Sequence, residues 1–247
     1  MIYDASEFIF SPGSEVARAR RVLIKPCAAY PLPYPVTTSR ETLGAIVRGI
    51  RRVSEADIVL LEGPEDDAHA RSIYRALGYD FPRVLGLDVR DCTLVEVENP
   101  LPKPFALPSY SVPNVLLSCD YLISVAPFKI LQGQGWFSIA NLLGLLSHTK
   151  YSNGGGKQGG VFGRADLHHV IADLYFTLPF DLGIVEARTK FSSEQDPTTG
   201  TMEEYGKIFV DEPFAVDCEA ATATKTHVNY IRLISAAKGA LETQIKR

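Results

Sequence analysis

The cysteine pattern excludes one large class of cofactor. The chain of 247 residues has four cysteines, Cys27, Cys92, Cys119 and Cys218, and no Cys-x-x-Cys pair. An iron–sulfur cluster needs a set of closely spaced cysteine thiolates, so we expect no iron–sulfur cluster here. The wide spacing favours isolated small residues, some of them buried, over a disulfide framework or a thiolate metal site. The sequence identifies no other cofactor.

Long apolar runs and a targeting segment are also lacking. The most apolar tract, around residues 115–131, contains Asp120 and Lys129 and is too polar to span a bilayer. The opening MIYDASEFIF has no lysine or arginine ahead of an apolar stretch, unlike a secretory signal. We therefore expect a cytoplasmic protein that does not enter a membrane.

Positive charge is in short supply. Lysine and arginine total 25 against 29 aspartate and glutamate, for a net charge of −4. Nucleic-acid binding needs clustered basic residues that displace counterions, so we expect no nucleic-acid partner. A basic pocket within an acidic protein is still compatible with this balance.

The hydrophobic pattern predicts an α/β protein. Short β-branched runs alternate with amphipathic segments in the rhythm of βαβ units. We expect strands at 21–26, 56–63, 92–99, 121–127, 182–188 and 207–212, and helices at 39–54, 66–79, 114–121, 136–147, 165–178, 215–225 and 229–242. Together they predict a mixed, largely parallel sheet with helices on both faces. Residues 1–247 would form a single elaborated domain, or two closely packed lobes; the sequence leaves the oligomeric state open.

Several of the expected strands end in an ionisable residue, namely Lys25, Glu62, Lys129, Glu186 and Asp211. Ligands of open parallel sheets bind beyond the carboxyl ends of the strands. We therefore expect these charges to meet along one rim and to form a cleft of mixed sign. The alternative is that each charge marks only the point where a strand emerges into solvent.

A possible anion site follows Lys25. Thr37, Thr38 and Ser39 stand at the start of the helix at 39–54, where free backbone N–H groups and hydroxyls suit a phosphate or carboxylate. Thr38 with Glu41 also fits a capping box, and plain N-capping is the alternative explanation.

A glycine-rich run, YSNGGGKQGGVFGRAD, occupies residues 151–166. It matches G-x-G-x-x-G, but the dinucleotide motif requires a strand immediately before it, and the segment before this run is helical. The run also lacks the spacing of a P-loop, since Lys157 is followed by Gln158. What remains is an anion-binding loop that carries Lys157, or an ordinary surface connection.

The next helix opens with His168 and His169, and Asp173 lies one turn beyond His169. A histidine and an aspartate at this spacing can orient an imidazole for proton transfer or share a metal ion. Two groups are a weak signal, and a surface or capping role is the simpler interpretation.

The order of several motifs, KPC, VTTSRETLGAIVRGIR, EGP, SVAPFK, IANLLGLL, LHHVIADL and EPFAVDCEAA, resembles the domain-of-unknown-function family 362 over about residues 20–240. The resemblance implies an α/β fold and a widespread prokaryotic family, many of whose members carry or accompany a ferredoxin-like iron–sulfur segment. It aligns these residues with family motifs: Lys25, Pro26, Thr37, Thr38, Glu62, Gly63, Lys129, Asn141, His168 and Asp217.

The chain also departs from the family pattern. Cys27 replaces an asparagine, Ile130 and Leu131 replace Thr-His, and Ala140 replaces a lysine. Where the family has Val-Ile-Asp-Gly, this chain has Ile-Val-Glu-Ala at 184–187. These changes imply that any chemistry of the wider family is modified or lost in this member.

These observations lead to one functional hypothesis and a rival. We expect an anionic small molecule, a phosphate or a carboxylate, to bind in the cleft, with or without a divalent cation. Its ligand-binding residues would be Lys25, Thr37, Thr38, Lys129, Asn141 and Lys157, and its acid, base or cation-binding candidates Glu62, Glu186, His168 and Asp217. The rival is a non-catalytic accessory protein that docks an iron–sulfur or redox partner. If the first holds, Lys25→Ala should weaken ligand binding more than folding.

Overall fold

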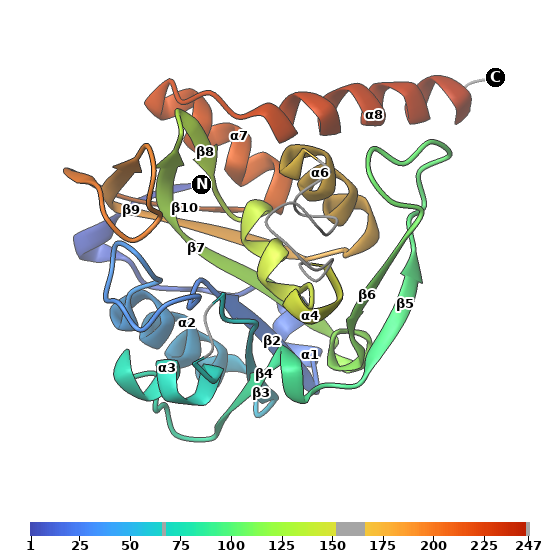
Figure 1. Ribbon diagram of the computed structural model, residues 1–247. Coiled ribbons are helices and arrows are strands. Elements are labelled where there is room, and N and C mark those ends of the chain that lie inside the picture. Colours follow the sequence, from blue (N-terminus) through green and yellow to red (C-terminus); the bar gives the residue numbers. More distant parts are fainter. Residues whose placement is uncertain (66–67, 152–165, 246–247) are drawn as a thin grey trace.

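A central sheet of eight strands organises the molecule (Figure 1). The computed structural model describes residues 1–65, 68–151 and 166–245. The strands are β1 Ile2–Asp4, β2 Arg21–Pro26, β3 Asp57–Glu62, β4 Val84–Asp88, β7 Tyr121–Leu131, β8 Gln134–Trp136, β9 Leu182–Ser193 and β10 Thr201–Asp211. They run in the order β1-β10-β9-β7-β2-β3-β4, and β8 pairs with β7.

Strands β4, β3, β2, β7 and β9 are parallel, whereas β1, β8 and β10 are antiparallel. The predicted mixed, largely parallel sheet is confirmed.

Helices cover both faces of this sheet, as predicted. The α-helices are α1 Ser14–Arg18, α2 Arg40–Val53, α3 Ala70–Ala76, α4 His148–Tyr151, α6 Leu167–Thr177, α7 Pro213–Thr224 and α8 Asn229–Ile245. Side chains of β2 alternate between two cores: Val22 and Ile24 pack with α1, α2 and α3, and Leu23 packs with α6 and α7. This period of two explains why the central strands are apolar throughout.

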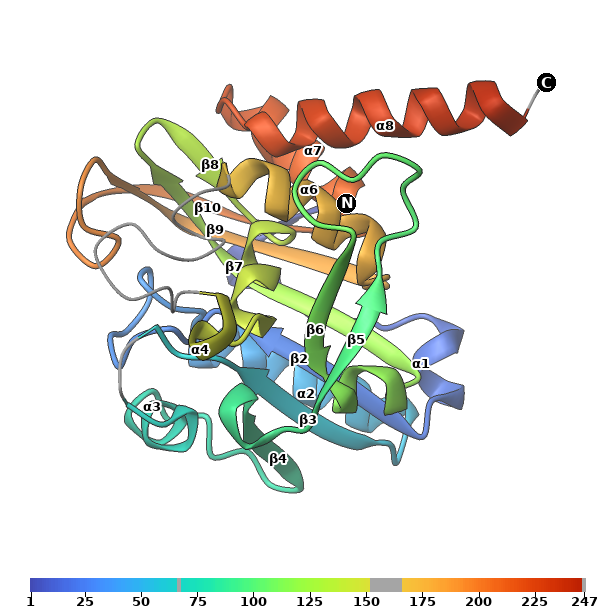
Figure 2. The same ribbon diagram turned by 45° about the vertical axis from the view of Figure 1, so that its right-hand side comes forward.

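A smaller sheet lies on the α6 side (Figure 2). Strands β5 Leu94–Glu98 and β6 Ser109–Pro113 form an antiparallel pair. Tyr110 and Val112 of β6 are fully buried in the same core as α6 and α7. The 3-10 helices η1 Ala5–Glu7, η2 Val89–Asp91, η3 Asn114–Ser118 and η4 Ala140–Leu145 complete the elements. None of the helices described is both long and apolar enough to cross a membrane.

Two expected helices are shorter and tighter than the sequence pattern indicates. The segment at 114–121 forms only the 3-10 helix η3, and the segment at 136–147 divides into the end of β8 and the 3-10 helix η4. Trp136 pairs with Lys129 across the β7–β8 hairpin, so this residue extends a strand instead of starting a helix.

The start of α2 differs by one residue from the predicted capping box. Ser39 is the N-cap, and its hydroxyl accepts the Thr42 N–H at 3.0 Å. Thr38 cannot serve because its hydroxyl donates to the Val125 carbonyl and accepts from the Cys27 N–H. Thr38 therefore ties the loop after β2 to β7.

Two of the charged residues expected at the carboxyl ends of the parallel strands, Glu186 and Asp211, lie away from those ends. Strand β9 continues to Ser193, which leaves Glu186 in its middle, and β10 runs antiparallel to β9. Asp211 pairs with Gly183 near the start of β9, and strands β9 and β7 lie between Asp211 and Lys25 of β2. The expectation of one rim with five charges is wrong for Glu186 and Asp211.

Candidate functional site

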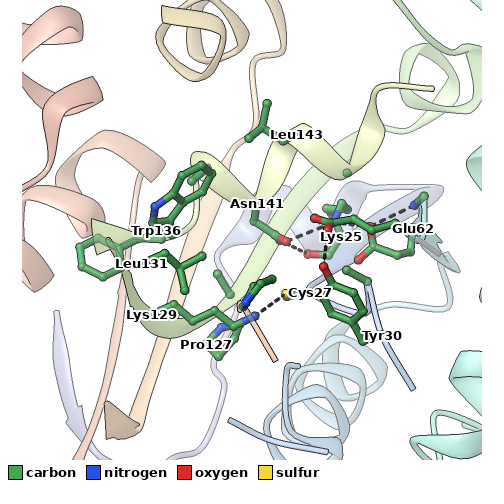
Figure 3. A pocket seen from close by; sticks show the side chains of 18 of the residues that line it. Lys25, Cys27, Tyr30, Glu62, Pro127, Lys129, Leu131, Trp136, Asn141 and Leu143 are labelled. Atoms are coloured by element: carbon green, nitrogen blue, oxygen red, sulfur yellow. Dashed lines mark hydrogen bonds and ion pairs between the residues drawn. The ribbon is translucent and has the colours of Figure 1, made fainter. Parts of the chain in front are cut away.

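A cavity of about 390 Å³ opens at the carboxyl ends of β2, β3 and β7 (Figure 3). Its polar lining residues are Lys25, Cys27, Tyr30, Glu62, Glu65, Lys129 and Asn141. Most of the remaining wall is apolar and includes Leu131, Trp136, Phe137, Leu143 and Leu167. A cavity of this size and composition is typical of small-molecule sites.

The floor of the cavity is a buried ion pair. Lys25 Nζ lies 2.7 Å from Glu62 Oε1, and both side chains are 1% exposed. Glu62 also accepts the N–H groups of Ala28 at 2.6 Å and Gly63 at 3.0 Å. Parallel pairing of β2 with β3 aligns Ile24 with Leu60, which brings the two charged residues to neighbouring strand ends. The charge of Lys25 is therefore already compensated within the protein.

Asn141 connects η4 to this floor. Its Oδ1 accepts from Lys25 Nζ at 3.1 Å, and its Nδ2 donates to the Lys25 carbonyl at 3.0 Å and to Ser124 Oγ at 3.1 Å. Both ends of the amide are thus engaged by β2 and β7. We conclude that Asn141 fixes the position of Lys25 and of η4.

Gly144 of η4 lies directly against the ion pair. A methyl group at this position would contact Glu62 Oε1 and come within 2.9 Å of Lys25 Nζ. We expect Gly144→Ala to lower the free energy of unfolding by about 1–3 kcal/mol, because the crowded pair must shift. Urea denaturation measures this, with Gly239→Ala as the control, since a methyl group at residue 239 meets no atom within 4 Å. Equal stability of both variants would contradict the close packing of η4 on the pair.

Lys129 differs from Lys25 in its partners. Its side chain is 7% exposed, and its Nζ lies 3.7 Å from Cys27 Sγ. Within the described part of the chain, Lys129 takes part in no ion pair. Figure 3 shows its ammonium directed toward Cys27, with Leu131 and Trp136 on the same side of the cavity.

Glu186 projects from the α2 face of the sheet, opposite to the face that packs on α6. Its neighbours Val185 and Ala187 belong to the α6 core, so Glu186 points toward α2. It accepts from Ser39 N at 2.9 Å, Ser39 Oγ at 2.5 Å and Thr42 Oγ1 at 2.8 Å. Burial raises the pKa of Glu186 above its usual value, and these hydrogen bonds oppose the rise.

The start of α2 is thus occupied by a carboxylate of the protein itself. The Thr37 hydroxyl donates to the Leu32 carbonyl at 2.6 Å and the Thr38 hydroxyl donates to the Val125 carbonyl at 2.8 Å. Neither threonine is among the residues that line the cavity. The helix start that sequence reasoning assigned to an external anion is filled by Glu186.

Asp217 of α7 is fully buried away from the cavity lining. Its Oδ1 accepts from Ser138 N at 2.9 Å and Ser138 Oγ at 2.6 Å, and its Oδ2 accepts from Ile139 N at 3.0 Å and Tyr230 Oη at 2.8 Å. Burial raises the pKa of Asp217 to about 6. The carboxyl group holds α7, α8 and the segment before η4 together.

His168 stands beside the cavity without lining it. Its ring lies 5.8 Å from the Trp136 ring and 6.2 Å from the Tyr230 ring, measured between centroids. Burial lowers the pKa of His168, which favours the neutral imidazole. No described residue is a hydrogen-bond partner of its buried Nδ1.

The expected pair of His169 and Asp173 is not formed. The Asp173 carboxylate accepts backbone N–H groups of residues 105–107 and the Tyr110 hydroxyl, whereas His169 stacks on Phe105 with centroids 6.0 Å apart. Asp173 therefore anchors the loop between β5 and β6. Lys157 lies outside the described residues.

Sequence reasoning missed the part of the cavity formed by Cys27, Tyr30 and Trp136. Cys27 follows the Lys25-Pro26 strand end directly, a signal that could have been used. Trp136 gave no comparable signal, because it reaches the cavity only through the β7–β8 hairpin. Across the described residues there is no group of three or more histidine, cysteine, aspartate or glutamate side chains that could hold a metal ion.

Comparisons with known proteins place this geometry in context. The structure of the lactate racemase apoprotein from Thermoanaerobacterium thermosaccharolyticum is similar in fold, with a TM-score of 0.53 and 13% sequence identity. The match covers 88% of this chain and 52% of the racemase chain, so this chain spans about half the length of that structure. A search of curated proteins found no match. Residues 22–222 match the family described as Domain of unknown function (DUF362). Within this matched range, Lys25, Glu62, Lys129 and Asn141 of this chain line the cavity. The chain therefore belongs to domain-of-unknown-function family 362.

Proposed function

We propose that this protein binds a small anion, a carboxylate or a phosphate compound, in the cavity at the carboxyl ends of β2, β3 and β7. Lys129 is the residue that receives the anion. The observation that carries the proposal is the nearly buried Lys129 ammonium, which has no carboxylate partner among the described residues. A buried charge is costly unless it is paired.

Lys25 has a supporting role in this proposal. Its Nζ is bonded to Glu62, Asn141 and the Pro26 carbonyl. These bonds use its charge and its donors, so Lys25 shapes the floor under the anion. Lys129 instead presents donors that a carboxylate or phosphate oxygen can accept.

The acid and base candidates also differ in whether they line the cavity. Among them only Glu62 lines the cavity; Glu186 and Asp217 bond to other parts of the protein, and the His168 ring lies next to the Trp136 ring. Proton transfer to a bound ligand would therefore fall to Glu62, within its pair with Lys25. The proposal itself is binding, and the fold is compatible with chemistry on the bound anion.

A divalent cation bound with the anion would meet one exposed carboxylate in the described lining of the cavity, that of Glu65. Both Glu62 oxygens already accept bonds from protein donors, whereas Glu65 is an exposed carboxylate at the cavity and bonds the Tyr30 hydroxyl. A divalent cation could bind Glu65 without disrupting the Lys25–Glu62 ion pair. Titration with Mg²⁺ or Ca²⁺ in the presence and absence of the anion tests this addition.

Titration calorimetry with lactate, butyrate and inorganic phosphate tests the main proposal; lactate is included because the racemase of similar fold is named for it. We expect Lys129→Met to weaken binding at least about tenfold, since a hydrogen bond to a charged group contributes about 1.5–3 kcal/mol. The thermal midpoint should stay the same or rise, because the substitution removes a buried charge. Lys103→Met, at an exposed position, is the control. Equal affinity in both variants would remove Lys129 from the site.

The rival hypothesis, an accessory protein that docks an iron–sulfur or redox partner, gives opposite results. It expects no heat of binding for any anion of this set. It also expects a ferredoxin-like protein to be captured equally by wild type and Lys129→Met.

A further inference from the structure

We infer that the anion is a monocarboxylate with an apolar body, such as a medium-chain aliphatic acid. This inference rests on the proposed function and goes further by naming the ligand class. It follows from two features of the cavity: the balance of its charges and the chemistry of the wall near Lys129.

The charge balance favours a ligand with one negative charge. The described lining contains two lysines and two glutamates, so its formal charge is zero before any ligand enters. Lys25 is neutralised by Glu62, and Glu65 is exposed to solvent, so Lys129 is the one buried charge of this lining without a counter-charge among the described residues. A carboxylate matches the one remaining ammonium of this lining, whereas a phosphate monoester brings up to two charges, of which one stays unpaired.

The wall beside Lys129 is apolar. Leu131 and Trp136 lie on the same side of the cavity as the Lys129 side chain (Figure 3), and Leu143 of η4 also lines the cavity. Phe137, which is fully buried, and Leu167 of α6 also line the cavity. A ligand whose carboxylate meets Lys129 would place its body against these side chains. Burial of apolar surface there favours a hydrocarbon body.

The polar groups of the cavity leave little for a hydroxylated body. The Asn141 amide, Lys25 and Glu62 are bonded to one another or to the backbone. Sugar hydroxyls in this cavity would lose water without gaining enough partners, which is unfavourable. The geometry therefore selects against sugar acids and sugar phosphates.

A ligand series of matched shape tests the inference. We expect the affinity to rise from acetate to butyrate to hexanoate by about fourfold for each added methylene, until the cavity is filled. Hexanoate should bind at least about tenfold more tightly than gluconate, which has the same number of carbons and the same head group. It should also bind more tightly than hexyl phosphate, which has the same tail and a more highly charged head. Each affinity is measured by titration calorimetry with wild type and Lys129→Met.

A variant of the wall and a cysteine reporter provide independent readouts. Leu131→Ser should weaken hexanoate at least about fivefold and leave acetate unchanged, because only the longer ligand reaches the wall. Cys27 lines the cavity, so bound hexanoate should slow its alkylation by iodoacetamide, followed by peptide mass spectrometry, while Cys119 outside the lining serves as control. Thermal melts show whether the variant is folded.

The outcomes separate this inference from the proposed function. If acetate, gluconate and hexanoate bind equally and all depend on Lys129, the apolar-body inference is overturned and the anion site stands. Tighter binding of hexyl phosphate than of hexanoate, again dependent on Lys129, would overturn the choice of a monocarboxylate. If none of these ligands binds, both proposals fail.

Discussion

Replacement of Lys25 by methionine is expected to lower the free energy of unfolding by about 3–5 kcal/mol, the usual cost of removing one member of a buried ion pair. Lys25 and Glu62 are each 1% exposed, so water cannot replace the lost ammonium. Asn141 Oδ1 also loses its donor. Urea denaturation at pH 7 measures the change. Sequence reasoning predicted the reverse order, with Lys25→Ala affecting ligand binding more than folding.

A second substitution provides the control. In Lys25→Met/Glu62→Gln the unpaired charge is gone, and the glutamine oxygen can still accept the Ala28 N–H. We expect the double variant to be more stable than Lys25→Met by at least about 1 kcal/mol. If the single variant is as stable as wild type, the charge of Lys25 is not compensated by Glu62, and Lys25 returns as a candidate for direct anion binding.

Asp217→Asn is expected to lower the free energy of unfolding by about 2 kcal/mol at pH 7. The carboxylate accepts two hydrogen bonds at each oxygen, and an amide presents N–H groups at one of these positions. The Ile139 N–H then loses its acceptor, because it cannot turn away as the Tyr230 hydroxyl can. The substitution leaves the cavity lining unchanged, so anion affinity at 10 °C should remain as in wild type.

The pH dependence of this effect has a definite sign. Burial raises the pKa of Asp217 from its usual 3.8 to about 6 in the folded protein. The folded state therefore binds this proton more tightly than the unfolded state, and the stabilisation is complete below about pH 4 and lost as the pH rises through about 6. At about 1.4 kcal/mol for each pKa unit, the contribution is on the order of 3 kcal/mol.

The difference in stability between wild type and Asp217→Asn should accordingly be larger at pH 4 than at pH 7. Denaturation curves at several pH values measure this difference, in which the titration of all other groups cancels to first order. Asp211→Asn, at a half-exposed position, should show no such trend. A difference that is constant or widens toward neutral pH would show that Asp217 is ionised throughout, held by its four donors.

The fold class was predictable because its signals are local. The runs at 57–62 and 121–131 are apolar on both faces, as strands covered by helices on both sides must be. The helix at 40–53 repeats its apolar residues at helical spacing and carries two arginines in its last turn. The 3-10 helix η4 was missed because its shape depends on Asn141 and Gly144, which pack on side chains far away in the sequence.

The candidate site was predictable only in part. Lys25, Glu62 and Lys129 lie around one cavity because β2, β3 and β7 are adjacent and parallel. Glu186 belongs to the same group of parallel strands, yet it faces α2, since side chains of a strand alternate between the two faces. Strand order and direction, which no local pattern encodes, place Asp211 beside the start of β9 and outside the cavity lining.

The α/β class, most of the central strands, the longer helices and the charged residues near the strand ends can be deduced from the amino-acid sequence, because hydrophobic period and residue type act over a few neighbouring positions. The partners of those charges follow from the three-dimensional packing. Lys25 is neutralised by Glu62, Glu186 accepts hydrogen bonds from Ser39, and Lys129 faces an apolar wall. The physical reason is that the free energy of a buried charge depends on the atoms within a few ångströms of it. Those atoms come from strands and loops that are distant along the chain.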